Sequence, residues 1–142
     1  MTMTPKDKAT KIVDKMYNND PMSKWLGIKR LEDGPGISVL EMTVREEMLN
    51  GFSIAHGGVT YSLADSALAF ASNSHGVQSV SIETSISHVK PVKAGDVLRT
   101  EVAEQNITRS TGLYYITVFN QENTAVAYFK GTVFRTGKEW EI

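Results

Sequence analysis

The segment Asn50-Gly51-Phe52-Ser53-Ile54-Ala55-His56-Gly57-Gly58 runs into Val59-Thr60-Tyr61-Ser62-Leu63-Ala64-Asp65-Ser66-Ala67, and this stretch decides the fold. A glycine pair opens a long run of small and apolar residues, which is typical of a helix buried on nearly every side. From Gly57 to Ser74 the only formal charge is the carboxylate of Asp65. Burying a lone carboxylate is costly, so such a group either belongs to a structural hydrogen-bond network or has a raised pKa and a chemical role. These residues alone leave both interpretations open.

The spacing of Gly57 and Asp65 predicts how a site could form. Eight residues separate them, which is about 12 Å along a helix axis. One substrate carbonyl cannot lie within about 3 Å of both groups of one chain. Two antiparallel helices related by a two-fold axis place the start of one beside the middle of the other, and two-fold dimers are the commonest oligomers. We therefore expect a homodimer as the minimal active unit.

The rest of the chain predicts an α+β fold without a linker, repeat or low-complexity segment, so we expect a single domain over residues 1–142. A five- to six-stranded antiparallel sheet must cover an apolar face, and the long helix is its natural partner. The expected elements are a short amphipathic helix over residues 5–19, a second from Asp20-Pro21 to Leu26, strands at 27–31 and 36–44, the long helix from near Gly57 to His75-Gly76, and strands near 79–87 and at 96–107, 112–120 and 124–135.

The strand near 79–87 alternates most clearly between apolar and polar residues. Its apolar face contains Val80, Ile82 and Ile86, and the alternation predicts that this face is buried. His88 falls on the same face, so we expect it to be a core histidine with its hydrogen bonds satisfied.

Several motifs together resemble a known family. They are Met48-Leu49-Asn50-Gly51, His56-Gly57-Gly58, Ser62-Leu63-Ala64-Asp65-Ser66-Ala67, Lys90-Pro91, Ala94-Gly95-Asp96-Val97-Leu98, Asn120-Gln121, Val126-Ala127 and Gly131-Thr132. In combination they resemble the hotdog-fold acyl-CoA thioesterases, specifically the phenylacetic-acid-pathway (PaaI-like) branch, over roughly residues 20–136. The resemblance implies a long central helix wrapped by the sheet, and a homotetramer. Lys90 departs from the Arg of many relatives, which keeps the charge but loses a forked phosphate contact.

The resemblance also implies roles for four residues. Asn50 and His56 would orient the site around a thioester, although a His before a helix is by itself more often a hydrogen-bonding cap residue. The amide of Gly57 is an unsatisfied donor at a helix start, where the dipole favours negative charge, so it suits a developing oxyanion. Asp65 would be the nucleophile or the general base, and the sequence leaves this choice open. Three side chains within a turn of Asp65 either donate hydrogen bonds to it or simply pack: Tyr61, Ser62 and Ser66.

A second group of residues suits the coenzyme A portion of a substrate. Their charge and their placement at strand ends or in a turn suit phosphate or pantetheine, although each residue taken alone is more often a solvated surface residue: Lys90, Arg109, Ser110, Thr111 and Gly112.

Composition excludes several other classes. The net charge is −1 without a long charged run, which argues against nucleic acid or a membrane as the main partner. The chain has no cysteine, which excludes disulfides and thiolate sites, and its three histidines are too scattered to predict a metal. No signal-peptide core or transmembrane run is visible, so we expect a cytoplasmic protein.

These observations favour an acyl-CoA thioesterase without a cofactor, since CoA is part of the substrate. The resemblance implies phenylacetyl-CoA or a hydroxylated aryl-acetyl-CoA, with medium-chain acyl-CoA as the alternative. A hydratase on the same fold is disfavoured because the chain lacks an Asp and a His flanking an Asn-Pro pair. A non-catalytic acyl-CoA binding or sensing module is disfavoured by Asp65 and Asn50, because a binder needs no buried acid.

Overall fold

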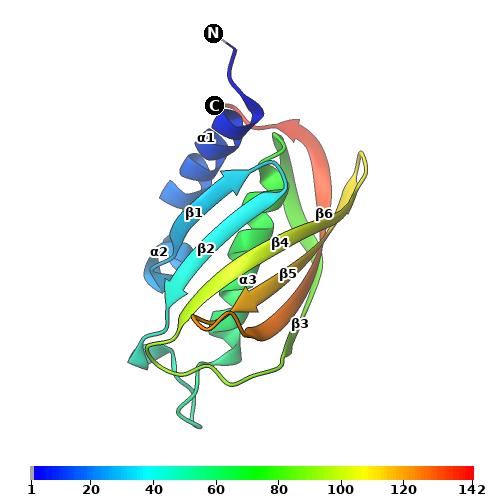
Figure 1. The fold of residues 1–142 in the computed structure, drawn as a ribbon. Coiled ribbons are helices and arrows are strands. Elements are labelled where there is room, and N and C mark those ends of the chain that lie inside the picture. The colour runs from blue at the N-terminus through cyan, green and yellow to red at the C-terminus, as the bar shows by residue number, and fades with distance from the viewer. Residues whose placement is uncertain (1) are drawn as a thin grey trace.

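The computed structural model describes residues 2–142 and follows the expected order of elements (Figure 1). The elements are α1 (Pro5–Asn18), α2 (Pro21–Leu26), β1 (Lys29–Gly34), β2 (Ile37–Thr43), the 3-10 turn η1 (Glu46–Met48), α3 (Gly57–Asn73), β3 (Val77–His88), β4 (Val97–Ile107), β5 (Thr111–Phe119) and β6 (Ala125–Glu139). None of the helices among residues 2–142 combines the length and hydrophobicity needed to cross a bilayer.

The strands form one sheet in the order β1-β2-β4-β5-β6-β3, and every neighbouring pair is antiparallel. The sheet curves around α3 (Figure 1). This is the hotdog arrangement, so the predicted fold class and the five- to six-stranded sheet are confirmed. The long strand β3 lies at one edge of the sheet, while α1 packs beside β1 at the other edge.

Helix α3 approaches strand β6 closely because Gly131 has no side chain. A Cβ added to Gly131 of β6 would lie 2.5 Å from Cδ2 of Leu68, which is too close for any real contact. Leu68 is buried with the rest of the core. The helix ends at Asn73, two residues before the predicted end, and Gly76 follows with a φ of 108° that a glycine adopts readily.

One face of α3 remains uncovered within the chain. Ten of its 17 residues are buried, and they lie toward the sheet and the N-terminal helices. The remainder includes Gly58, Ser62, Asp65 and Ala69, which are spaced three or four residues apart and therefore form one stripe. The expectation of a helix buried on nearly every side is wrong for this stripe, which runs beside the edge strand β3.

The predicted core face of β3 is also wrong in its first half. The side chains of Val80 and Ile82 are 56% and 60% exposed. The register against β6 shifts between Ser81 and Glu83, and the extra residue turns the preceding side chains to the opposite face. Ile86, beyond the shift, packs against the core as predicted.

Helix α2 is attached to α3 by a short chain of hydrogen bonds. The Asp20 carboxylate caps α2 and accepts from both the backbone and the hydroxyl of Ser23, at 2.9 and 2.6 Å. The fully buried Ser23 hydroxyl also lies 2.8 Å from the hydroxyl of Ser66. The carboxylate of Asp20 is therefore held next to the part of α3 that carries Asp65.

Candidate active site

The start of α3 presents one free backbone donor. The Nδ1 atom of His56 accepts from the N–H of Gly58 at 2.9 Å, and the carbonyl of His56 accepts from Val59. Among residues 2–142 the N–H of Gly57 has no partner. His56 therefore caps the helix, and the donor it leaves free belongs to Gly57. This amide lies at the positive end of the helix dipole, where it suits an oxyanion.

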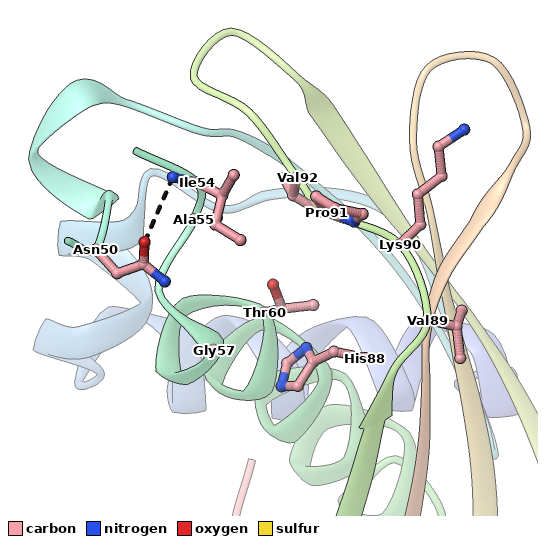
Figure 2. Close-up of a pocket in the computed structure, with 10 residues that line it drawn as sticks. All are labelled: Asn50, Ile54, Ala55, Gly57, Thr60, His88, Val89, Lys90, Pro91 and Val92. Carbon is pink, nitrogen blue, oxygen red and sulfur yellow. Dashed lines mark hydrogen bonds between the residues drawn. The ribbon is translucent and has the colours of Figure 1, made fainter. Parts of the chain in front are cut away.

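Asn50 organises the loop before the helix. Its Oδ1 accepts from the backbone of Phe52 at 2.8 Å and of Ile54 at 3.4 Å. These bonds occupy the oxygen, so the Nδ2 group remains to donate. Figure 2 shows this nitrogen on the side of the residue that faces Gly57.

A hollow of about 370 Å³ opens at this helix start. Residues of the loop, of α3 and of the segment after β3 surround it (Figure 2). Its walls combine apolar side chains with a few polar groups, as ligand sites do: Asn50, Ile54, Ala55, Gly57, Thr60, His88, Val89, Lys90, Pro91 and Val92.

Three polar residues of this hollow are His88, Thr60 and Lys90. His88 is exposed at the end of β3, and its ring lies against Gly57, so the prediction of a core histidine is wrong. It remains on the inner face of the sheet, but the strand extends past the core at this point. Thr60, which sequence reasoning missed, directs its hydroxyl into the hollow (Figure 2). Its position three residues after Gly57 was a usable signal, because such residues share a helix face. Lys90 lies at the rim.

Asp65 faces a different hollow, of about 260 Å³, between α3 and β3. Its side chain is half-buried rather than buried. Burial raises the pKa of the carboxyl group, and the negative charge of Asp20 raises it further. Ser79 and Ser81 line the same hollow. The sequence did not predict that these two serines lie beside Asp65, because the alternation of β3 does not reveal its register shift.

The three hydroxyl residues near Asp65 are engaged elsewhere. Tyr61 pairs with Thr84 of β3, and its ring packs edge-on against Phe129. The hydroxyl of Ser62 donates to the carbonyl of Gly58 at 2.7 Å, and Ser66 pairs with Ser23. Of the two roles open for these residues, the structure shows packing and local hydrogen bonding.

The predicted coenzyme A residues separate into two places. Lys90 lies at the hollow of Gly57, whereas Arg109 and Ser110 lie in the β4–β5 turn and Thr111 and Gly112 begin β5, at the far end of the sheet in Figure 1. Thr111 is level with Val80 across the sheet, because both pair with Phe134. From Val80 to His88 the strand rises about 26 Å. Within one chain, this turn and the hollow of Gly57 therefore lie far apart.

Comparison with known proteins identifies the family. A family model described as Thioesterase superfamily matches residues 52–127. The acyl-coenzyme A thioesterase PaaI of Escherichia coli is 39% identical over 130 residues, which are 92% of this chain and 93% of that protein. A putative esterase of Archaeoglobus fulgidus is 39% identical over 130 residues, which are 92% of this chain and 84% of that protein.

Solved structures agree. That of the E. coli PaaI protein, from the phenylacetic acid degradation operon, gives a TM-score of 0.93 at 38% identity and covers 96% of this chain and 99% of that chain. A Streptococcus mutans protein bound to acetyl-CoA gives a TM-score of 0.77 at 30% identity, over 80% of this chain and 91% of that chain. The chain belongs to the thioesterase superfamily. Within it, the chain is a PaaI-like thioester hydrolase of the hotdog fold.

The environment of Asp65 predicts that its charge destabilises the folded chain. A pKa raised on folding means that the folded state holds the proton more tightly than the unfolded state. Stability therefore falls as the pH rises from the ordinary Asp pKa of about 3.9 through the raised value. We expect Asp65→Asn to have a higher thermal midpoint than the wild type at pH 7, with a smaller difference at pH 4.5.

The matched control is Glu122→Gln, which removes an exposed carboxylate in the β5–β6 turn and should change the midpoint little at either pH. A lower midpoint for Asp65→Asn at pH 7 would show that the carboxylate stabilises the fold and would contradict this assignment.

Proposed function

We propose that two copies of the chain hydrolyse an acyl-CoA at shared sites, each formed by the Gly57 end of one α3 and Asp65 of the other. This proposal rests on the observation that the free Gly57 amide and the Asp65 carboxylate lie in separate hollows of one chain. Neither hollow contains both the donor and the acid that thioester hydrolysis needs. The catalytic roles of Asn50, His56, Gly57 and Asp65 belong to this proposal.

The free edge of the molecule supports the pairing. β3 is a 12-residue edge strand with Val80 and Ile82 exposed, and it lies beside the uncovered stripe of α3. Unpaired strand edges of this length are usually covered. A two-fold axis near Tyr61 and Thr84, which contact each other, would join two β3 strands antiparallel. It would also bring Gly57 level with the partner's Asp65, because Tyr61 lies midway between these positions.

The chemistry follows from this placement. The carbonyl oxygen of the thioester accepts from the Gly57 amide, which stabilises the oxyanion as it forms. The partner's Asp65 either removes a proton from water, whose hydroxyl then attacks the acyl carbon, or attacks that carbon itself to give an anhydride that water opens. In both routes the C–S bond breaks, and the thiolate of CoA leaves and takes up a proton. A raised pKa makes the carboxylate a stronger base. The proposal needs no metal or bound cofactor.

The same symmetry gives the coenzyme A residues a place. The two-fold rotation about an axis at Thr84 brings the row of the partner's Val80 and Thr111 level with His88. In a sheet continuous through β3, the partner's β4–β5 turn would be three strands away, about 14 Å. A CoA molecule spans that distance. We therefore assign its phosphates and pantetheine to Lys90 of one chain and to residues 109–112 of the other.

For the acyl group we propose phenylacetyl or a hydroxylated aryl-acetyl group. Two observations support this: the likeness to the E. coli PaaI protein, which comes from the phenylacetic acid degradation operon, and a hollow whose walls include Ile54, Ala55 and Val92. The S. mutans relative bound to acetyl-CoA supports a CoA thioester as the substrate class. Medium-chain acyl-CoA is the alternative that a substrate panel tests.

The direct test is release of free thiol from phenylacetyl-CoA, its ring-hydroxylated forms and medium-chain acyl-CoAs. We expect steady-state turnover that is highest for the aryl-acetyl group. Asp65→Asn should lower kcat by about 100-fold or more, since positioned acid–base groups contribute that much. Its thermal midpoint and oligomeric state show whether the fold is retained. Binding without turnover by the wild type would identify an acyl-CoA binding module instead.

Shared sites predict that two inactive chains restore each other. Asn50→Asp keeps the oxygen that accepts from Phe52 and Ile54 but removes the free amide donor. Two chains with different tags, one Asp65→Asn and one Asn50→Asp, are co-expressed and the hybrid is purified. It should regain about half of the wild-type kcat per dimer, because one of its two sites is intact.

The control is each inactive homodimer, purified with the same tags. If Asn50 and Asp65 acted within one chain, both sites of the hybrid would carry a defect. A hybrid no more active than the homodimers would therefore contradict shared sites.

The assigned phosphate contacts predict a selective effect on KM. Lys90→Ala and Arg109→Ala should each raise KM for acyl-CoA about tenfold, with kcat little changed, because a charge-assisted bond equal in ground and transition state is lost. The effect should shrink at high salt. It should also be small for the acyl-pantetheine thioester, which lacks the nucleotide.

Lys130→Ala is the matched control. This lysine lies 3.7 Å from Glu83 on the outer face of the sheet and should leave KM unchanged. An equal rise in KM for both substrates would assign Lys90 or Arg109 to the fold or the chemistry rather than to the nucleotide.

A further inference from the structure

His88 stands out among the three histidines because its ring has no partner. His56 uses Nδ1 as the helix cap, and His75 bonds Glu104 at 2.6 Å. Among residues 2–142 the ring of His88 makes no hydrogen bond or ion pair. It is also exposed in a hollow that we assign to the substrate. A free imidazole in such a position is available to a ligand.

The contacts of Gly57 place the ring next to the free amide. A Cβ built on Gly57 would lie 3.1 Å from Nε2 of His88. The nitrogen of Gly57 lies about 2.5 Å from that Cβ position by ordinary backbone geometry, so the two nitrogens are at most about 5.6 Å apart. An oxygen that accepts a bond of about 2.9 Å from each of two donors joins nitrogens up to about 5.8 Å apart. The separation of the two nitrogens is therefore compatible with one carbonyl oxygen that accepts from both.

We propose that His88 is a catalytic residue whose Nε2–H donates a hydrogen bond to the thioester oxygen, beside the amide of Gly57. This inference rests on the proposed function. A neutral imidazole with its proton on Nε2 can donate this bond, so the role needs no change of charge. The donor comes from the end of β3, and the other donor comes from α3. The packing of strand against helix therefore determines how well the two converge.

The absent side chain of Gly57 supports this arrangement. The imidazole lies where a Cβ would meet it at 3.1 Å, so a larger residue would press against the ring and fill the space near the amide. Gly57 thus carries the free backbone donor and, because it has no side chain, leaves room for the second donor.

Two variants separate the effect of the nitrogen donor of His88 from the effect of its aromatic ring. His88→Phe keeps an aromatic ring and removes the nitrogen, and it should lower kcat roughly 10- to 100-fold, as loss of an oxyanion donor does. His88→Gln carries an amide nitrogen near the position of Nε2, and its kcat should exceed that of His88→Phe by about fivefold. Ser87→Ala, on the outer face of the same strand, is the control and should behave as the wild type.

A binding measurement adds a readout that packing alone would not move. Two unreactive analogues are compared by calorimetry: a ketone, in which a methylene replaces the thioester sulfur, and a thioether, in which a methylene replaces the carbonyl. The wild type should prefer the ketone, and His88→Phe should reduce that preference about fivefold, the effect of one hydrogen bond. A folded His88→Gln should retain part of the preference.

The outcomes are distinct. Suppose that the wild type hydrolyses acyl-CoA and that the kcat of His88→Phe lies within about threefold of the wild-type kcat, or that only KM changes. Either result would overturn the role of His88 and leave the proposed function standing. An unchanged ketone preference in His88→Phe would also overturn it. A wild type that releases thiol from no acyl-CoA would overturn the proposed function itself.

Discussion

The structure depends on helix α3, which packs its apolar side against the sheet and leaves a polar stripe on its other side uncovered. The core needs the apolar side of α3, and the close approach at Gly131 brings that side against β6. The other side carries the free donor of Gly57 at one end and Asp65 two turns later. The helix that stabilises the fold therefore also sets the separation of the two proposed catalytic groups.

The N-terminal helices add electrostatics to this geometry. Asp20 caps α2, and the Ser23–Ser66 contact holds α2 against α3. The charge of Asp20 acts together with burial to raise the pKa of Asp65. A carboxylate that is held in an unfavourable environment costs stability, but it is a better base at neutral pH. The stability cost at Asp65 and its proposed reactivity therefore have the same physical cause.

Much of the fold was accessible from sequence, and the reason is local pattern. The glycine pair, the apolar run and the turn residues predicted α3, the succession of helices and strands along the chain and an antiparallel sheet. The wrapping of that sheet around α3 was implied by the family resemblance. The register shift at Ser81 and Glu83 was not accessible, because one inserted residue leaves the alternation of β3 unchanged. His88 was assigned to the core for a different reason: alternation predicts the face on which a side chain lies but not where along the strand the core ends.

The candidate site was accessible only in part, because its pieces meet across the sheet or across two chains. Spacing alone separated Gly57 from Asp65, and the two hollows agree with it. The most direct measurement is a crystal structure of the protein with the ketone analogue of its acyl-CoA. The account predicts a carbonyl oxygen within hydrogen-bond distance of the Gly57 amide, with the nearest Asp65 carboxylate belonging to the other chain. A carbonyl bound beside Asp65 of the same chain would contradict it.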